Sequence, residues 1–223
     1  MDTIKIVIFN NKGGVAKTTT VINLAYSLQA YDKKILVVDC DTQENCFGFF
    51  MANKTADAIL HTDYDRIDHT TWSRYSKLPV EPEGYDYVIF DMPPTINDEV
   101  RVVLRQCNTV YVPIKLGEFE ISGLRKVTDE INQLGIKFGG VFVTMYQARK
   151  HAEILMEVRR ILGKRLLETV IPFSDSVDKS LMNGLPIKAY FTEHGVPKTK
   201  NSWKIVDAYE DLALEIMRGE GNG

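Results

Sequence analysis

The sequence predicts an α/β fold in which a doubly wound, mainly parallel sheet carries helices on both faces. Short apolar, β-branched runs alternate along the 223 residues with stretches whose apolar residues recur at helical spacing. This alternation is typical of parallel strands joined by crossover helices. The composition, 44% hydrophobic and 26% charged, is that of an ordinary globular protein. Length and composition favour one large domain over residues 1–223 rather than two small ones.

The strands are expected where apolar runs end in turn-forming residues. They are predicted at residues 4–9, 35–38, 87–90, 109–114, 140–144 and 166–171. Helices are predicted at residues 18–30, 97–106, 121–134, 151–162 and 202–217. Residues 52–86 show no clear periodicity and contain breaks at Pro79, Pro82 and Gly84. They are a surface excursion or a docking loop, and the sequence leaves both open.

Cysteine content and hydropathy indicate the cellular compartment. Cys40, Cys46 and Cys107 form no CxxC pair and leave an odd cysteine, which favours free thiols in a reducing cytoplasm. Asp2 and Lys5 interrupt the apolar start of the chain, unlike a signal peptide. No apolar stretch is long enough to span a bilayer. We therefore expect a soluble, cytoplasmic protein with no stable membrane association.

The net charge of −3 hides an asymmetry along the chain. Residues 137–204 contain twelve Lys and Arg but six Asp and Glu, a balance of +6 that leaves −9 for the remainder. Such a basic part is typical of a surface for a polyanionic partner, or of solvated helix faces. Charge alone favours the solvated faces.

A glycine-rich segment lies between the first predicted strand and the first predicted helix, which is the context of a phosphate-binding loop. Its backbone N–H groups and the positive end of the helix would form an anion site. The residues expected to bind nucleotide are Asn11, Lys12, Gly13, Gly14, Val15, Ala16, Lys17, Thr18 and Thr19.

The loop is a variant of the common phosphate-loop pattern. GxxxxGK[ST] is not met, because Asn11 and Ala16 stand at its two glycine positions. The pattern KGGxxK[ST][ST] is met, with Lys12 as a second lysine at the head of the loop. Lys17 is expected to contact the β- and γ-phosphates, and the Thr18 hydroxyl to bind Mg²⁺. The segment therefore predicts binding of ATP with Mg²⁺.

Three carboxylates follow two other predicted strands. Asp39 and Asp41 come directly after one strand and Asp91 after another. In open α/β sheets, ligands bind at the carboxyl ends of the strands. Asp91 is therefore expected to hold Mg²⁺, through a water molecule, while Asp39 and Asp41 contact the metal shell and orient the attacking water. An isolated aspartate after a strand is usually turn chemistry, but three beside such a loop favour a catalytic site.

With these residues the chain resembles the ParA/MinD family of deviant Walker A ATPases, its partition-type branch in particular. The segments that carry the resemblance are NKGGVAKTTT, ILVVDCDTQ, YDYVIFDMPPT, VTMYQAR, TVIPFSDSVDKSLMNGLPI and AYEDLALEI. They span nearly the whole chain. The resemblance implies a Mg²⁺-dependent ATPase that acts in plasmid or chromosome partition.

The resemblance also implies roles for individual residues. Lys12 would cross a dimer interface onto the partner's nucleotide, so that ATP drives formation of a homodimer. Lys12, Lys17 and Asp41 are the expected catalytic residues, with Asp41 linked to hydrolysis and switching. The implied partners are a second copy of the chain, a ParB-type adaptor and non-specific duplex DNA. The ATP-bound protein would associate with the nucleoid.

The DNA contacts are expected in the basic carboxy-terminal part, at Lys198, Lys200 and Lys204. Lys204 falls where the family places a DNA-contacting arginine. Phe173 and Ser176 occupy two other positions where partition ATPases often carry arginine, and Thr42 replaces a common proline.

Two alternatives belong to other functional classes. A MinD-like division-site or polar-positioning ATPase would need a basic amphipathic tail, whereas the last residues here are rich in glycine and poor in basic charge. An iron–sulfur carrier or other metabolic relative would need paired or bridging cysteines, which the spacing does not provide.

Overall fold

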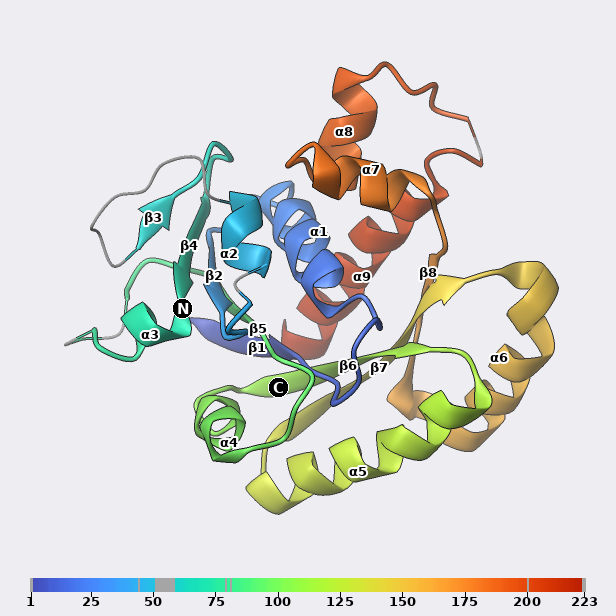
Figure 1. Ribbon diagram of the computed structural model, residues 1–223, viewed down its shortest axis with the longest axis horizontal. Coiled ribbons are helices and arrows are strands. Elements are labelled where there is room, and N and C mark those ends of the chain that lie inside the picture. Colours follow the sequence, from blue (N-terminus) through green and yellow to red (C-terminus); the bar gives the residue numbers. More distant parts are fainter. Residues whose placement is uncertain are drawn as a thin grey trace.

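A mainly parallel sheet crosses the centre of the protein, with helices packed on both faces (Figure 1). The computed structural model describes residues 2–43, 45–50, 59–78, 80, 82–199 and 201–221, with only the backbone of residues 47, 118–122 and 221. The strands are β1 (Ile4–Ile8), β2 (Ile35–Asp39), β3 (Leu60–His61), β4 (Ile67–Thr71), β5 (Tyr87–Asp91), β6 (Thr109–Lys115), β7 (Lys137–Tyr146) and β8 (Leu166–Pro172). Within these described residues they form one sheet of order β3-β4-β2-β5-β1-β6-β7-β8, and β3 alone pairs antiparallel. The predicted fold class is confirmed.

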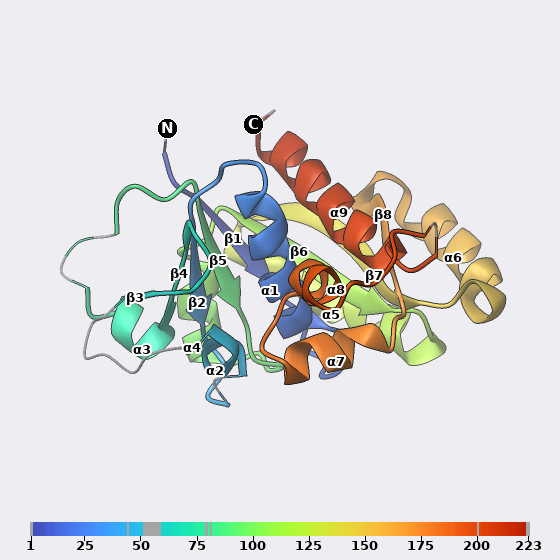
Figure 2. The same ribbon diagram turned by 90° about the horizontal axis from the view of Figure 1, so that it is seen from above.

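The helices divide between the two faces of the sheet. The elements are α1 (Lys17–Gln29), α2 (Asn45–Phe50), α3 (Trp72–Tyr75), α4 (Asp98–Leu104), α5 (Glu118–Leu134), α6 (Ala148–Leu162), α7 (Ser176–Met182), α8 (Ile187–Glu193) and α9 (Lys204–Gly221), with a 3₁₀ turn at Gly163–Arg165. Figures 1 and 2 show α1, α2, α7, α8 and α9 on one side and α3 to α6 on the other. None of the described helices is both long and apolar enough to cross a bilayer.

The central strand β1 contributes to a hydrophobic core on each face. Ile6 and Ile8 belong to the core under α1 and α9, whereas Val7 and Phe9 belong to the core over α4 and α5. Successive side chains of a strand point to opposite faces. A continuous apolar run is therefore what a strand covered on both sides requires.

The segment that showed no periodicity in the sequence contains a buried strand. All five residues of β4 are buried, and β4 pairs parallel with β2. Its Asp68 accepts a hydrogen bond from the Tyr85 hydroxyl, at 2.7 Å, and contacts the His61 ring at 2.6 Å. Hydrogen bonding offsets the cost of burying this polar strand, which explains why hydropathy misses it. A surface excursion is thus wrong for residues 67–71, while residues 52–58, 79 and 81 of the same segment lie outside the described residues.

Helix α9 is attached to the sheet by two carboxylates. Glu220 accepts hydrogen bonds from the Tyr111 hydroxyl at 2.7 Å and from Thr109 Oγ1 at 3.0 Å. Glu215 accepts the backbone N–H groups of Glu168 and Thr169 at 2.7 and 3.0 Å. Glu168 and Thr169 belong to β8, the strand at the edge of the sheet. Glu215 therefore binds backbone N–H groups that could otherwise pair with a strand of another chain.

Four short helices were not predicted, namely α2, α3, α7 and α8. They have four to seven residues each, too few for a helical period to be evident in a sequence. In Figure 1, α2 lies beside α1, whereas α7 and α8 lie next to each other above α1. The three cysteines are free thiols, as predicted.

Candidate nucleotide-binding site

The loop between β1 and α1 is held by hydrogen bonds to the neighbouring strand. The Phe9 N–H donates to the Tyr111 carbonyl at 3.0 Å, and the Asn10 side-chain amide donates to the Pro113 carbonyl at 2.8 Å. The Asn10 side-chain oxygen also accepts the Lys12 N–H at 3.1 Å. Asn10 therefore joins the start of the loop to β6. The sequence analysis missed this role, although Asn10 stands directly before the loop.

A second anchor comes from β7. The Thr144 hydroxyl lies 3.2 Å from the Val15 carbonyl and 3.1 Å from the Ile114 carbonyl, and Thr144 is fully buried. Thr144 lies in the segment VTMYQAR that carries part of the family resemblance, which is the only sequence signal for this contact. Both ends of the loop are therefore positioned by long-range contacts.

The backbone of the loop needs unusual conformations at two positions. Gly14 has φ = 71°, and an added Cβ at Gly13 or Gly14 meets no atom within 4 Å, so the space above the loop is open. Ala16 has φ = 62° and ψ = 36°, in the left-handed region. Ala16 stands directly before α1, so the helical conformation begins only at Lys17. A glycine adopts this conformation freely, whereas an alanine is strained by about 1 kcal/mol.

Lys17 lies inside the loop, at the first residue of α1. Its ammonium donates to the Lys12 carbonyl at 2.8 Å, and the residue is 8% exposed. Burial lowers the pKa of Lys17, while the nearby charges of Asp91 and Asp41 act in the opposite direction. The ammonium thus lies near two carboxylates and donates to a backbone carbonyl oxygen. A phosphate oxygen can take the place of that carbonyl.

Thr18 and Asp91 lie side by side at the carboxyl ends of the strands. The Thr18 hydroxyl donates to Asp91 Oδ2 at 2.7 Å. Asp91 is 1% exposed, and its other oxygen, Oδ1, is buried with no hydrogen-bond partner. Burial is the main cause that raises the pKa of Asp91 to about 7, and Asp39 adds to it. An unsatisfied buried carboxylate oxygen beside a threonine hydroxyl is the arrangement that a divalent cation would complete.

The two carboxylates after β2 organise their own loop. Asp39 pairs with Asp91 in the register of β2 and β5. Asp39 Oδ1 accepts the Asp41 N–H at 2.9 Å, and Asp41 Oδ1 accepts the Gln43 N–H at 3.0 Å. These two successive side-chain turns form the bend without the family's proline at Thr42. They place Asp41 within electrostatic reach of Lys17.

The donor set is suited to Mg²⁺ rather than to a protein-enclosed metal. Within the described part of the chain, no three His, Cys, Asp or Glu side chains are grouped to hold a metal ion. Mg²⁺ uses one or two protein oxygens and takes its remaining ligands from water and phosphate. Thr18 and Asp91 fit that requirement.

A small cavity adjoins the loop on the side of α1 that faces β7 and β8. It has a volume of about 80 Å³ and is lined by Ala16, Thr19, Met145, Pro172 and Phe173, among others. Phe173 is 47% exposed. An aromatic side chain, a proline and a methionine beside a phosphate loop form a surface on which a flat base can stack.

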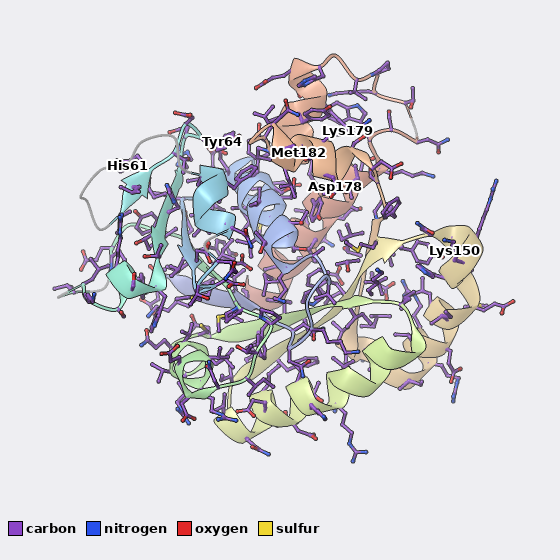
Figure 3. All side chains as sticks on the ribbon, in the orientation of Figure 1. His61, Tyr64, Lys150, Asp178, Lys179 and Met182 are labelled. Carbon is purple, nitrogen blue, oxygen red and sulfur yellow. The ribbon has the colours of Figure 1, made fainter. Side chains whose placement is uncertain are left out.

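The predicted basic surface is only partly described. Lys198 lies over the Trp203 ring at 4.8 Å, Lys204 is exposed at the start of α9, and Lys200 lies outside the described residues. Lys150 and Lys179 are exposed on α6 and α7 (Figure 3).

Several other basic residues of this region form ion pairs. Arg159, Arg160 and Lys188 each lie within 2.7 Å of a glutamate oxygen. Part of the +6 balance is therefore neutralised locally.

The strand–loop–helix context, the buried Lys17 and the Thr18–Asp91 pair define a P-loop nucleotide-binding protein with an additional lysine at the head of the loop. A family model described as "CobQ/CobB/MinD/ParA nucleotide binding domain" matches residues 6–187. The chain therefore belongs to this family, which includes the ParA and MinD ATPases that the sequence resembles.

Curated relatives match along almost the whole chain. The chromosome-partitioning ATPase Soj of Treponema pallidum is 25% identical over 97% of this chain and 98% of its own length. The chromosome partitioning protein ParA of Myxococcus xanthus is 28% identical over 96% of this chain and 87% of its own length. The prediction of a partition-type relative is confirmed at the level of the family.

Solved structures share the fold. The cell-division ATPase MinD of Pyrococcus furiosus superposes with a TM-score of 0.80 at 20% identity, over 97% of this chain and 99% of its own. Apo McdA of Cyanothece gives a TM-score of 0.75 at 18% identity, over 96% of this chain and all of its own.

Proposed function

We propose that this protein is a partition ATPase that binds ATP with Mg²⁺, dimerises around two nucleotides, and binds duplex DNA non-specifically in that state. The observation that carries the proposal is the buried Asp91 carboxylate, which has one oxygen bound by Thr18 and the other without a partner. A family member named for chromosome partition supports the biological role. A ParB-type adaptor would then stimulate hydrolysis.

The phosphates would bind to the loop itself. The N–H groups of residues 13–19 and the amino end of α1 supply an anion site, and Lys17 exchanges the Lys12 carbonyl for phosphate oxygens. Thr18 and Asp91 would hold Mg²⁺, with Asp39 in its outer shell. When bound, the ion neutralises phosphate charge and fixes the geometry of the γ-phosphate.

The base would lie in the small cavity beside the loop. Ala16 and Thr19 line this cavity together with Pro172 and Phe173, so it is continuous with the phosphate site. Phe173 stands where partition ATPases often carry arginine, and an aromatic ring there favours stacking on the base over a contact with DNA.

Hydrolysis would use Asp41 and a lysine of the second subunit. Asp41 lies next to the phosphate site and is held by its bond to the Gln43 N–H; it would orient the attacking water. Lys12 of the partner subunit would offset the charge that develops on the phosphates, as an arginine finger does.

Mass measurements test the nucleotide-driven dimer. Light scattering should show a monomer without nucleotide and a dimer with ATP and Mg²⁺, most clearly in Asp41→Ala, which retains its ATP. Lys17→Ala should stay monomeric, whereas the control Lys33→Ala, at the opposite end of the strands, should behave like the parent. A constant monomer mass under all conditions would refute the proposal.

The DNA surface would depend on Lys198, Lys200 and Lys204. Sequence-independent phosphate contacts release counterions, so the affinity should fall steeply with salt. Fluorescence anisotropy with unrelated duplexes, using ATP-loaded Asp41→Ala at about 50 and 200 mM salt, measures this. Lys204→Glu should weaken binding more than the control Lys77→Glu on α3's carboxyl side. Equal loss in both, or no binding at the lower salt, would contradict the assignment.

A further inference from the structure

Gly123 occupies an interior position of α5, where a glycine needs a reason. A glycine inside a helix costs about 1 kcal/mol relative to alanine. Gly123 is the sixth residue of a 17-residue helix, and its φ is not among the positive values. Backbone conformation therefore does not explain the glycine, which leaves the close approach of another group.

The group that approaches is the side chain of Lys12. A Cβ built on Gly123 would lie 2.7 Å from Lys12 Cε, 3.5 Å from its Nζ and 3.6 Å from its Cδ. Real Cβ contacts are never as short as the first of these, so an alanine would displace the lysine stem. The aliphatic part of Lys12 thus packs on the bare helix backbone, as lysine stems commonly pack on apolar surface.

We propose that Gly123 is a positioning residue that forms a slot for Lys12 in the single subunit, and that emptying this slot accompanies assembly on ATP. The proposal rests on the proposed function, in which Lys12 reaches the partner's nucleotide. A side chain stored on its own α5 cannot reach a second subunit at the same time. The stability of the slot therefore sets how readily the dimer forms.

The loop couples the slot to nucleotide binding. The Lys12 carbonyl accepts the Lys17 ammonium at 2.8 Å. When ATP takes Lys17 away from this carbonyl, the backbone of Lys12 loses one of the bonds that hold it in place. Binding of phosphate would thereby loosen the residue whose side chain must leave the slot.

Acylation of Lys12 tests the slot without nucleotide. The full chain is treated with a limiting amount of acetic anhydride, and the modification of Lys12 is followed by peptide mass spectrometry. Gly123→Ala should raise the rate for Lys12 by about threefold or more, because the stem is expelled into solvent. The control Asn132→Ala raises the helix propensity of α5 at an exposed position and should leave the rate unchanged. An unchanged rate in Gly123→Ala overturns the slot.

Dimerisation tests its consequence. In the Asp41→Ala background, Gly123→Ala should lower the ATP-dependent dimer dissociation constant by roughly 3- to 10-fold, because only the stored state is destabilised. The effect should vanish when Lys12→Ala is added, since no stem then fills the slot. If the dimer dissociation constant of Gly123→Ala is equal to that of the parent or higher, the slot does not control dimerisation. If the protein without the Gly123 substitution never dimerises, the proposed function is wrong, and so is the release of Lys12 toward a second subunit. The acylation rates would still show whether Gly123 forms a slot for Lys12.

Discussion

The substitution Asp91→Asn is expected to stabilise the nucleotide-free protein while it impairs binding of ATP with Mg²⁺. Asparagine keeps the shape of the side chain and an oxygen that can accept the Thr18 hydroxyl, at 2.7 Å in the parent. It removes a negative charge that is 1% exposed and lies beside Asp39. The variant therefore separates the fold from the chemistry of the site.

The magnitude follows from the raised pKa of Asp91. Burial holds that pKa at about 7, against an ordinary value of 3.8. The folded state therefore binds a proton that the unfolded state has already released, so stability falls as the pH rises from about 4 to 7. A tenfold change in proton affinity corresponds to about 1.4 kcal/mol, which sets a ceiling of roughly 4 kcal/mol. Structural relaxation and water screen part of this energy. We therefore expect Asp91→Asn to raise the free energy of unfolding by roughly 1–3 kcal/mol at pH 8 and not at all near pH 4.

Two measurements check the prediction. Urea denaturation of the nucleotide-free protein at pH 8 and pH 4.5 gives the change in the free energy of unfolding. Isothermal titration calorimetry with ATP and Mg²⁺ should show at least about tenfold weaker binding, or 1.4 kcal/mol. Asp65→Asn, which removes an exposed carboxylate before β4, is the matched control and should change neither quantity.

The opposite pattern would refute this account of Asp91. A variant that is less stable than the parent at pH 8 would mean that the Asp91 charge is compensated in the free protein. Unchanged affinity for ATP with Mg²⁺ would mean that another oxygen holds the ion.

Three further predictions concern neighbouring parts of the molecule. Asp41→Ala should retain ATP affinity within about threefold but lose most of its turnover, measured by phosphate release; equal loss of both would contradict its role with water. Burial lowers the pKa of His69 to about 4, so the contribution of the neutral ring to the free energy of unfolding is complete above pH 6.5 and is lost as the pH falls toward 4. His69→Gln should therefore flatten the pH dependence of the free energy of unfolding, measured with urea, between pH 7 and 5. The exposed control His194→Gln should leave that dependence unchanged. Ala16→Gly should raise the free energy of unfolding by about 1 kcal/mol without weakening ATP binding, because it relieves the strain at φ = 62°; a less stable variant would exclude strain at that position.

Sequence patterns predicted the parts of the fold that have a strong local period. The apolar runs of β1, β2, β5, β6 and β7 are largely buried, and α1, α5 and α6 are long enough for their apolar residues to recur over several turns. The polar strand β4 was missed because its burial depends on Asp68, whose partners Tyr85 and His61 lie elsewhere in the chain. Hydrogen bonds between distant residues leave no period in a sequence.

The sequence by itself determined the chemistry of the candidate site. The glycines, lysines and threonines of residues 11–19 lie close together along the chain, and Asp39 and Asp91 each end an apolar strand. The prediction that they bind nucleotide and metal follows from residue type and from the shared edge of a parallel sheet. These inferences required no knowledge of which strands are neighbours.

Only the tertiary structure decided how these groups interact. The register of β2, β5 and β1 brings Asp39 and Asp91 together and leaves one oxygen of Asp91 without a partner. The packing of α5 against the loop brings Gly123 next to the Lys12 side chain, although Lys12 lies more than a hundred residues earlier in the chain. The left-handed Ala16 likewise follows Val15, whose carbonyl accepts a hydrogen bond from Thr144 of β7. Each feature arises from contacts between segments that are distant in sequence, and such contacts form only when the chain has folded.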